Sequence, residues 1–226
     1  MLNIEDKDKV VEMAQFGIFY GHKKTKTHPK MKNFIGGRRN EVELIDPEAT
    51  VQSFNKAAAF LKEKIQNGGL ILFVGTQAPA KEAIKSVAED LKMPFVDFRW
   101  LGGTMTNFSI IKKRLDHYES LKAKREAGEL SKYTKKEQTQ FSKEIGKLSR
   151  NFEGLKNLVR LPDAVFLVDS VIHKTAVAEA NKLGIPLVAL IDTDDNPEPI
   201  QYPILCNDHA KSSISWIISA LKEEVK

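Results

Sequence analysis

Three aspartates that follow an apolar run are the residues of this sequence best suited to chemistry. Asp192, Asp194 and Asp195 come after residues 187–191, and α/β proteins place their sites where such strands end. Clustered carboxylates there can hold a magnesium ion or accept a phosphoryl group. Beside Asn196 they are also typical of a turn, because Asp and Asn side chains hydrogen-bond their own backbone. The turn is the favoured interpretation, and a magnesium- and phosphate-dependent enzyme or sensor is the alternative.

Other patterns associated with catalysis or metal binding are incomplete. Gly75 and Thr76 follow an apolar run but belong to no G-x-G-x-x-G string or P-loop lysine motif. Ser170 and His173 are close in sequence but lack a nucleophile elbow. Possible ligands without metal-ligand spacing are His22, His28, His173, His209 and Cys206. We therefore expect no catalytic residue, no metal and no cofactor.

Basic residues that can bind a polyanion are the second chemical feature. Residues 21–40 contain seven basic and no acidic residues, and residues 108–158 contain thirteen basic and seven acidic ones. The two segments therefore carry +7 and +6 within a chain of net charge +5, which leaves −8 for the rest. Such segregation is expected of a nucleic-acid-binding surface. The alternative, a solvated loop and a solvated helix pair, fits the first segment less well, because an unrelieved basic run repels itself without an anion nearby.

The first basic segment has the side chains that phosphates require. Lysines act as flexible point charges, whereas arginines can fork onto one phosphate or stack on a base. Gly36 and Gly37 would let the backbone come close. The candidate anion-binding residues of this segment are Lys23, Lys24, Lys26, Lys30, Lys32, Arg38 and Arg39.

Hydrophobic periodicity predicts the elements that position these residues. Continuous apolar runs at 70–74, 164–168 and 187–191 are typical of strands covered on both faces. Helices are expected over residues 3–16, 47–66, 80–91, 175–183 and 208–224, with Asp46 as the cap and Pro47 as the first residue of the second. Residues 34–35 and 42–45 flank a Gly-containing stretch, as in a hairpin or a loosely paired set of strands. The alternation predicts a doubly wound parallel α/β sheet.

Residues 108–158 interrupt that alternation. Their apolar residues recur at steps of three and four in two stretches, which is heptad spacing. Gly128 is expected to end one helix, Thr134 and Glu137 to form a capping box that begins the next, and Asn107 to cap the first. We predict a basic antiparallel helical hairpin (108–158) inserted into an α/β body (1–107 and 159–226).

Several strings occur in the order and spacing of one known family. They are Gly21-His22, residues 28–32, Arg39-Asn40, residues 98–108 (FRWLGGTMTNF), residues 161–163, residues 183–186, residues 191–193 and Asn207-Asp208. On these strings, nearly the whole chain resembles the bacterial small-subunit ribosomal protein S-two family. The family's basic stretch after Asp169 is replaced by Ser170-Val171-Ile172, so no RNA contact is assigned there.

The resemblance implies a flavodoxin-like α/β body with an inserted coiled-coil hairpin and a structural, non-catalytic role in translation. The expected partners are small-subunit (16S) ribosomal RNA and neighbouring small-subunit proteins, including the large one that recruits messenger RNA. The expected rRNA-binding residues are His22, Lys23, Lys24, Lys26, Lys30, Lys32, Arg38, Arg39 and Arg99. In the motif around Trp100, packing is expected to outweigh RNA contact for Arg99 and Trp100.

The cysteine content and the hydropathy of the chain agree with a ribosomal protein. The single cysteine fits a reducing compartment, and neither a signal sequence nor an apolar stretch of membrane-spanning length is evident. We expect a cytoplasmic protein in the ribosome, without a membrane partner. DNA binding is not expected, because no helix-turn-helix accompanies the basic segments.

Overall fold

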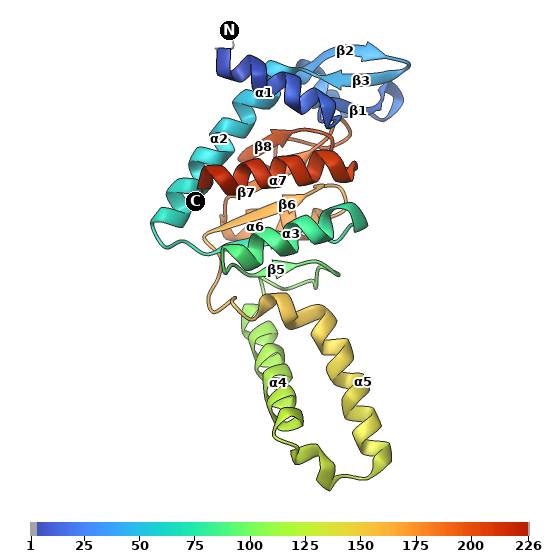
Figure 1. Cartoon of the computed structure of the whole chain (residues 1–226), viewed down its shortest axis with the longest axis vertical. Coiled ribbons are helices and arrows are strands. Elements are labelled where there is room, and N and C mark those ends of the chain that lie inside the picture. Colours follow the sequence, from blue (N-terminus) through green and yellow to red (C-terminus); the bar gives the residue numbers. More distant parts are fainter. Residues whose placement is uncertain (1–3, 226) are drawn as a thin grey trace.

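A five-stranded parallel sheet forms the centre of the computed structural model, which describes residues 4–225 (Figure 1). Its strands are β4 (Ile71–Val74), β5 (Phe95–Val96), β6 (Ala164–Val168), β7 (Leu187–Ile191) and β8 (Tyr202–Leu205), in the spatial order β5-β4-β6-β7-β8. Numbered along the chain from β4, this is the 2-1-3-4-5 order of flavodoxin-like folds. The three predicted runs form the three central strands, β4, β6 and β7, and every residue of these strands is buried.

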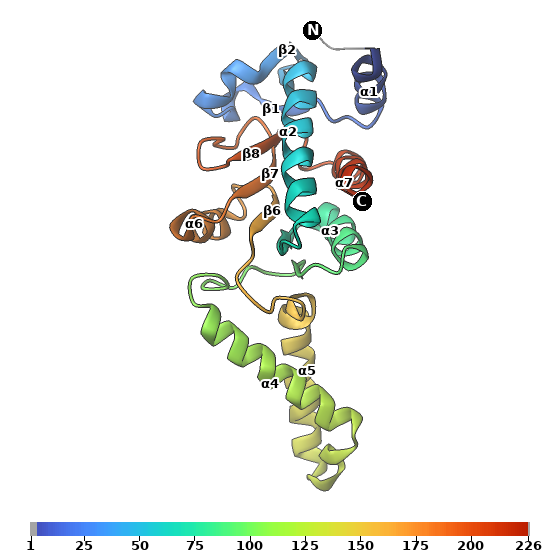
Figure 2. The same cartoon turned by 90° about the vertical axis from the view of Figure 1, so that its left-hand side faces the viewer.

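Helices cover both faces of this sheet. On one face, α2 (Pro47–Gln66), α3 (Ala78–Asp90) and α7 (Lys211–Val225) share a core with Phe73 and Phe166. On the other face, α6 (Lys174–Leu183) shares a core with Leu72 and Leu167. Figure 2 shows α3 and α7 on one side of the strands and α6 on the other. Alternate strand residues enter different cores because successive side chains point to opposite faces.

The helix boundaries lie close to those predicted. Asp46 accepts a hydrogen bond from the Glu48 backbone at 3.2 Å, and Pro47 is the first residue of α2. The first helix, α1, spans Ile4–Gln15. Its predicted first residue, Asn3, lies outside the described residues. The last helix begins at Lys211, three residues later than predicted, because Asn207 accepts the backbone N–H groups of His209 and Ala210 in a turn of its own.

The basic N-terminal segment forms a small antiparallel sheet of β1 (Tyr20–Lys23), β3 (Val42–Ile45) and β2 (Ile35–Arg39), in that spatial order. The short 3-10 helices η1 (Lys24–Lys26) and η2 (Pro29–Phe34) connect β1 to β2. The predicted hairpin is confirmed: β2 and β3 turn at Asn40 and Glu41, both with positive φ. Strand β1 was not predicted.

Two long helices extend from the body at the end opposite to this small sheet (Figure 1). They are α4 (Phe108–Glu126) and α5 (Lys135–Phe152), linked by η3 (Glu129–Lys132) and followed by η4 (Glu153–Leu155). We call residues 108–155 the arm. Gly128 has φ 72° beyond the end of α4, and Thr134 forms the predicted capping box with Glu137. The two arm helices run in opposite directions and contact each other.

The predicted cap at Asn107 is wrong. Its side chain makes no capping hydrogen bond. A capping side chain requires an extended backbone, whereas Asn107 has φ −126° and ψ 45° and already continues a turn through its N–H bond to the Gly103 carbonyl. Only the Asn107 carbonyl takes part in the helix, where it accepts the backbone N–H groups of Ile110 and Ile111.

Candidate nucleic-acid interface

The basic side chains of the N-terminal segment lie on the outside of the small sheet and its two 3-10 helices. All seven lysines and arginines between residues 21 and 40 are exposed, whereas Met31 beneath them is fully buried. The apolar residue anchors η2 while the lysines on either side of it, Lys30 and Lys32, remain in solvent. The buried side of this segment therefore fixes the position of its exposed basic side.

Three of these seven cations have carboxylate partners. Lys23 Nζ lies 3.5 Å from Glu41 Oε2, Arg38 Nη2 lies 3.3 Å from Glu43 Oε1, and Lys30 pairs with Glu198. These carboxylates lie outside residues 21–40 in sequence but next to the segment in the fold. The segment's surroundings are therefore less positive than its own sequence suggests. Lys24, Lys26, Lys32 and Arg39 have no ion-pair partner within residues 4–225, and Arg39 donates a hydrogen bond to the Tyr20 hydroxyl at 3.4 Å. The three lysines are therefore the cations most available to an anion.

The segment is fixed to the loop after β7 by close backbone contacts. The His22 N–H donates to Thr193 Oγ1 at 2.8 Å, and the His28 N–H donates to the Thr193 carbonyl at 2.8 Å. Gly21 permits this approach, since a Cβ there would lie 2.4 Å from Thr193 Cγ2. The motif glycine before His22 thus serves packing against residues 192–195.

The aspartate loop itself has the hydrogen bonding expected of a turn. Asp195 Oδ1 accepts the backbone N–H groups of Ser170 and Val171, at 3.1 and 3.2 Å, and its Oδ2 accepts the Asp192 N–H at 2.9 Å. Burial raises the pKa of Asp195 to about 6. Its oxygens are therefore occupied by donors within the chain.

His22 lies against this loop. Its Nδ1 is 3.2 Å from Asp192 Oδ2 and 3.4 Å from Asp194 Oδ1. The Asp192 carboxylate raises the pKa of His22, although burial opposes the shift. Within the described residues, His22, Asp192 and His209 form one group whose ligand atoms are close enough to hold a metal ion, and Asp169, Asp208 and His209 form another. His22 is thus directed at carboxylates, unlike the exposed lysines that follow it.

Arg99, the last of the nine predicted RNA-binding residues, lies apart from the other eight. It is exposed in the loop between β5 and α4, at the arm end of the molecule, whereas the small sheet lies at the opposite end (Figure 1). The expectation that Arg99 mainly packs is wrong, because its side chain is exposed, whereas its neighbour Trp100 packs against the core. The two parts of the predicted site are not brought together.

Arg99 instead joins a basic cluster that sequence reasoning missed. It lines a cavity of about 910 Å³ together with Arg114 from α4 and with Lys143, Lys147 and Arg150 from α5. These five cations come from three separate stretches of chain, so no continuous run reveals them. The signal in the sequence was only the basic excess of residues 108–158.

The motif that contains Arg99 is held by one buried carboxylate. Glu179 on α6 accepts hydrogen bonds from the backbone N–H groups of Gly103, Met105 and Thr106, at 2.8 to 3.0 Å, and from the Trp100 indole. Gly103 has φ 90°, a conformation that favours glycine. The glycines and Trp100 therefore shape the connection between sheet and arm.

The sequence model for the family described as Ribosomal protein S2 matches residues 13–226. The chain belongs to this ribosomal protein family. Curated relatives include the Small ribosomal subunit protein uS2 of Dehalococcoides mccartyi strains BAV1 and CBDB1, each 38% identical over 216 residues, which is 96% of this chain and 88% of the relative.

Family membership agrees with the resemblance drawn from the strings around His22 and Trp100. A ribosomal protein of this family is structural, and neither the match nor the hydrogen-bonded Asp195 supports the alternative of a magnesium-dependent enzyme. Within residues 4–225, no helix is long and apolar enough to cross a membrane.

Proposed function

We propose that this protein is a structural component of the small ribosomal subunit that binds ribosomal RNA through exposed cations at both ends of the molecule. The observation that carries the proposal is the family match across residues 13–226, with relatives named as small-subunit proteins. The exposed, unpaired Lys24, Lys26 and Lys32 support it.

The N-terminal surface has the features of a phosphate-binding element. Most of its lysines lie on η1 and η2, and Thr193 braces the backbone of the segment at His22 and His28, so binding an anion requires little ordering of the backbone. Arg38 and Arg39 lie on the exposed strand β2 and can fork onto phosphate oxygens. Phosphate contacts of this kind fix the position and orientation of a protein on RNA.

We expect neighbouring small-subunit proteins as further partners, including the large one that recruits messenger RNA, and a cytoplasmic location in the ribosome. We also expect coiled-coil packing between the arm helices, because Ile111, Leu115 and Tyr118 are buried at steps of four and three along α4. The arm then supplies the second basic surface, which includes Arg99.

Sedimentation of the full chain tests the proposal. A tagged copy expressed in a bacterium should migrate with small subunits in a sucrose gradient at physiological salt. Treatment of the same lysate with ribonuclease should return it to the top of the gradient, because the RNA that holds it has been cut. Recovery of the untreated protein wholly in the ribosome-free fraction would overturn the assignment.

A further inference from the structure

The root of the arm, where the loop between β5 and α4 joins it to the body, carries an exposed aromatic ring between two cavities. Phe98, in the loop between β5 and α4, is 46% exposed and belongs to neither apolar core. It lines both the 910 Å³ cavity and a second one of about 450 Å³ between α3 and the end of α5. Lys81 Nζ lies 5.5 Å from the centre of its ring. The exposed ring therefore offers an aromatic surface beside a cation.

Charge differs between the two cavities. The larger one has five cations, Arg99, Arg114, Lys143, Lys147 and Arg150, against the single carboxylate of Glu144, which lies 3.2 Å from His117 Nε2. None of the five has an ion-pair partner within the described part of the chain. This cavity is therefore suited to phosphate groups.

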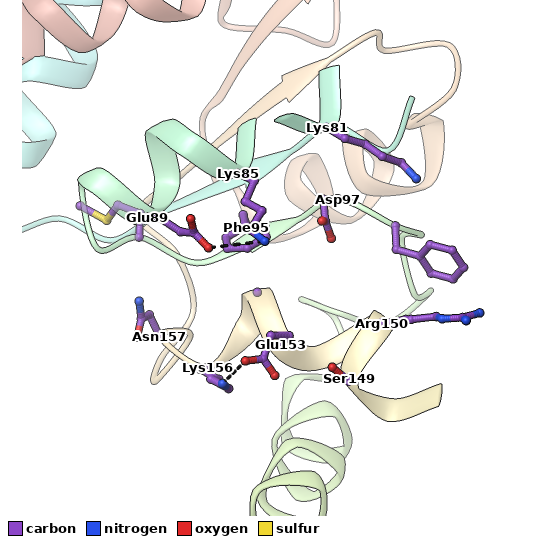
Figure 3. Close-up of a pocket in the computed structure, with 13 residues that line it drawn as sticks. Lys81, Lys85, Glu89, Phe95, Asp97, Ser149, Arg150, Glu153, Lys156 and Asn157 are labelled. Atoms are coloured by element: carbon purple, nitrogen blue, oxygen red, sulfur yellow. Dashed lines mark hydrogen bonds and ion pairs between the residues drawn. The ribbon is translucent and has the colours of Figure 1, made fainter. Parts of the chain in front are cut away.

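The smaller cavity is nearly neutral. Its four cations face three carboxylates, and two of them, Lys85 and Lys156, pair with Glu89 and Glu153, as the dashed lines of Figure 3 mark. Figure 3 shows Lys81 and Arg150 extending in the same direction from opposite sides of this cavity. Asp97, which precedes Phe98 and also lines the cavity, offers a carboxylate to N–H donors. Such a site suits a polar, uncharged ring better than a phosphate.

We propose that the root of the arm binds an unpaired RNA nucleotide, with its base stacked on Phe98 and the adjoining phosphates held in the cavity lined by Arg99, Arg114, Lys143, Lys147 and Arg150. This inference rests on the proposed binding of ribosomal RNA and names the structural class of RNA that this end recognises. Unstacked bases are recognised by aromatic side chains, and cations follow the backbone. A base within a duplex cannot reach the ring, so the site discriminates against paired RNA.

Binding of short RNA probes to the full chain tests this inference. The probes are a fluorescent single-stranded RNA of about ten nucleotides, of mixed sequence, and the same strand in a duplex. Phe98→Leu should weaken binding of the single strand about 5- to 150-fold, the effect of losing one aromatic stack. It should barely change duplex binding, whereas Phe98→Tyr should retain wild-type affinity for both. Thermal melting of Phe98→Leu should match the wild type, since the ring is outside both cores.

Tyr133 supplies the matched control. It is 47% exposed on the same arm, lies beside Phe141 and lines neither of the two cavities. Tyr133→Leu should therefore leave both affinities unchanged. Equal affinities of wild type and Phe98→Leu for the single strand would overturn the inference, as would an equal loss for both probes. Either result leaves the proposed function standing if the chain still sediments with small subunits, whereas failure of the wild type to sediment there would overturn the proposed function itself.

Discussion

Glu179 and Trp100 meet at the root of the arm, where Oε1 of the carboxylate lies 3.0 Å from the indole Nε1. The two residues are 79 positions apart in sequence. Glu179 is buried on α6, and its other hydrogen bonds hold the backbone of the segment that leads into α4. One side chain of the body therefore fixes the direction in which the arm leaves it.

Glu179→Gln should destabilise the protein. The amide retains one acceptor oxygen but presents an NH2 group where the carboxylate accepted backbone N–H groups, and each buried donor left unpaired costs about 1–3 kcal/mol. In a Trp216→Phe background, Trp100 emission should shift to longer wavelength as the indole gains contact with water. Urea denaturation followed by this emission measures both effects. An unchanged midpoint together with an unchanged spectrum would contradict the role given to Glu179.

The same carboxylate should make stability depend on pH. Burial raises the pKa of Glu179, but hydrogen bonds from Thr106, Trp100 and Gly103 outweigh it and hold the pKa below the ordinary value of 4.5. The folded state then binds fewer protons than the unfolded state, so the stabilisation is complete above pH 4.5 and is lost as the pH falls through the folded-state pKa. The Tm of the wild type should fall more steeply than that of Glu179→Gln below pH 4.5. Parallel Tm curves for the two proteins would show that another group is responsible.

Two glycines of the arm should respond in opposite directions to alanine. A Cβ at Gly154 would lie 2.3 Å from the Phe95 carbonyl oxygen, whereas nothing lies within 4 Å of one at Gly146. Gly154→Ala should therefore destabilise by about 1–3 kcal/mol, because backbone must move to admit it. Gly146→Ala, in the interior of α5, should stabilise by about 0.5–1 kcal/mol. Chemical denaturation of both variants checks the pair, and a neutral Gly154→Ala would mean that the arm is less closely packed against β5.

The elements that sequence reasoning predicted well are those whose signal is local. Central strands such as β6 are continuous apolar runs, and the cap of α2 depends on Asp46 and its immediate neighbours. Strands β5 and β8 were not predicted, because their signal is not local. Strand β5 has only two residues and forms by pairing with β4. Strand β8 contains Pro203, which an edge strand accommodates.

The site was harder to predict because its decisive contacts join distant parts of the chain. Nothing near Gly21 in sequence reveals that Thr193 will lie against it. The grouping of Arg99 with Arg150 likewise depends on how the arm leaves the sheet. Sequence reasoning identified the basic residues but neither their carboxylate partners nor their separation into two surfaces.

The predicted division into body and arm can be tested by two deletions. The core that contains Leu72 of the sheet includes Phe152, Leu155 and Leu158 and, further along the arm, Ile111, Leu115, Tyr118, Leu121, Leu130 and Ile145. Replacing residues 108–151 by a flexible linker keeps the first three and removes the other six, and it should leave a folded α/β body with a lowered Tm. Replacing residues 108–158 removes all nine and should lower the Tm further, since each lost buried side chain costs about 2–5 kcal/mol. Loss of cooperative melting in the shorter deletion would show that body and arm fold as one unit.

The salt dependence of RNA binding tests the central claim most directly. Small-subunit ribosomal RNA is titrated over about 50–200 mM salt with three proteins. They are the full chain, a triple variant with Lys24, Lys26 and Lys32 changed to Gln, and a control on α4 with Lys122, Lys124 and Arg125 changed to Gln. Lys23 is left in place because Glu41 already lies 3.5 Å away. Each lost phosphate contact lowers the slope of log affinity against log salt by roughly 0.7–0.9, so the N-terminal variant should lose about 2–3 in slope. The control should lose less, because Lys122 is already 3.5 Å from Glu153. An N-terminal variant with the wild-type slope and affinity would contradict the account, because the basic N-terminal surface would then not be where the RNA is held.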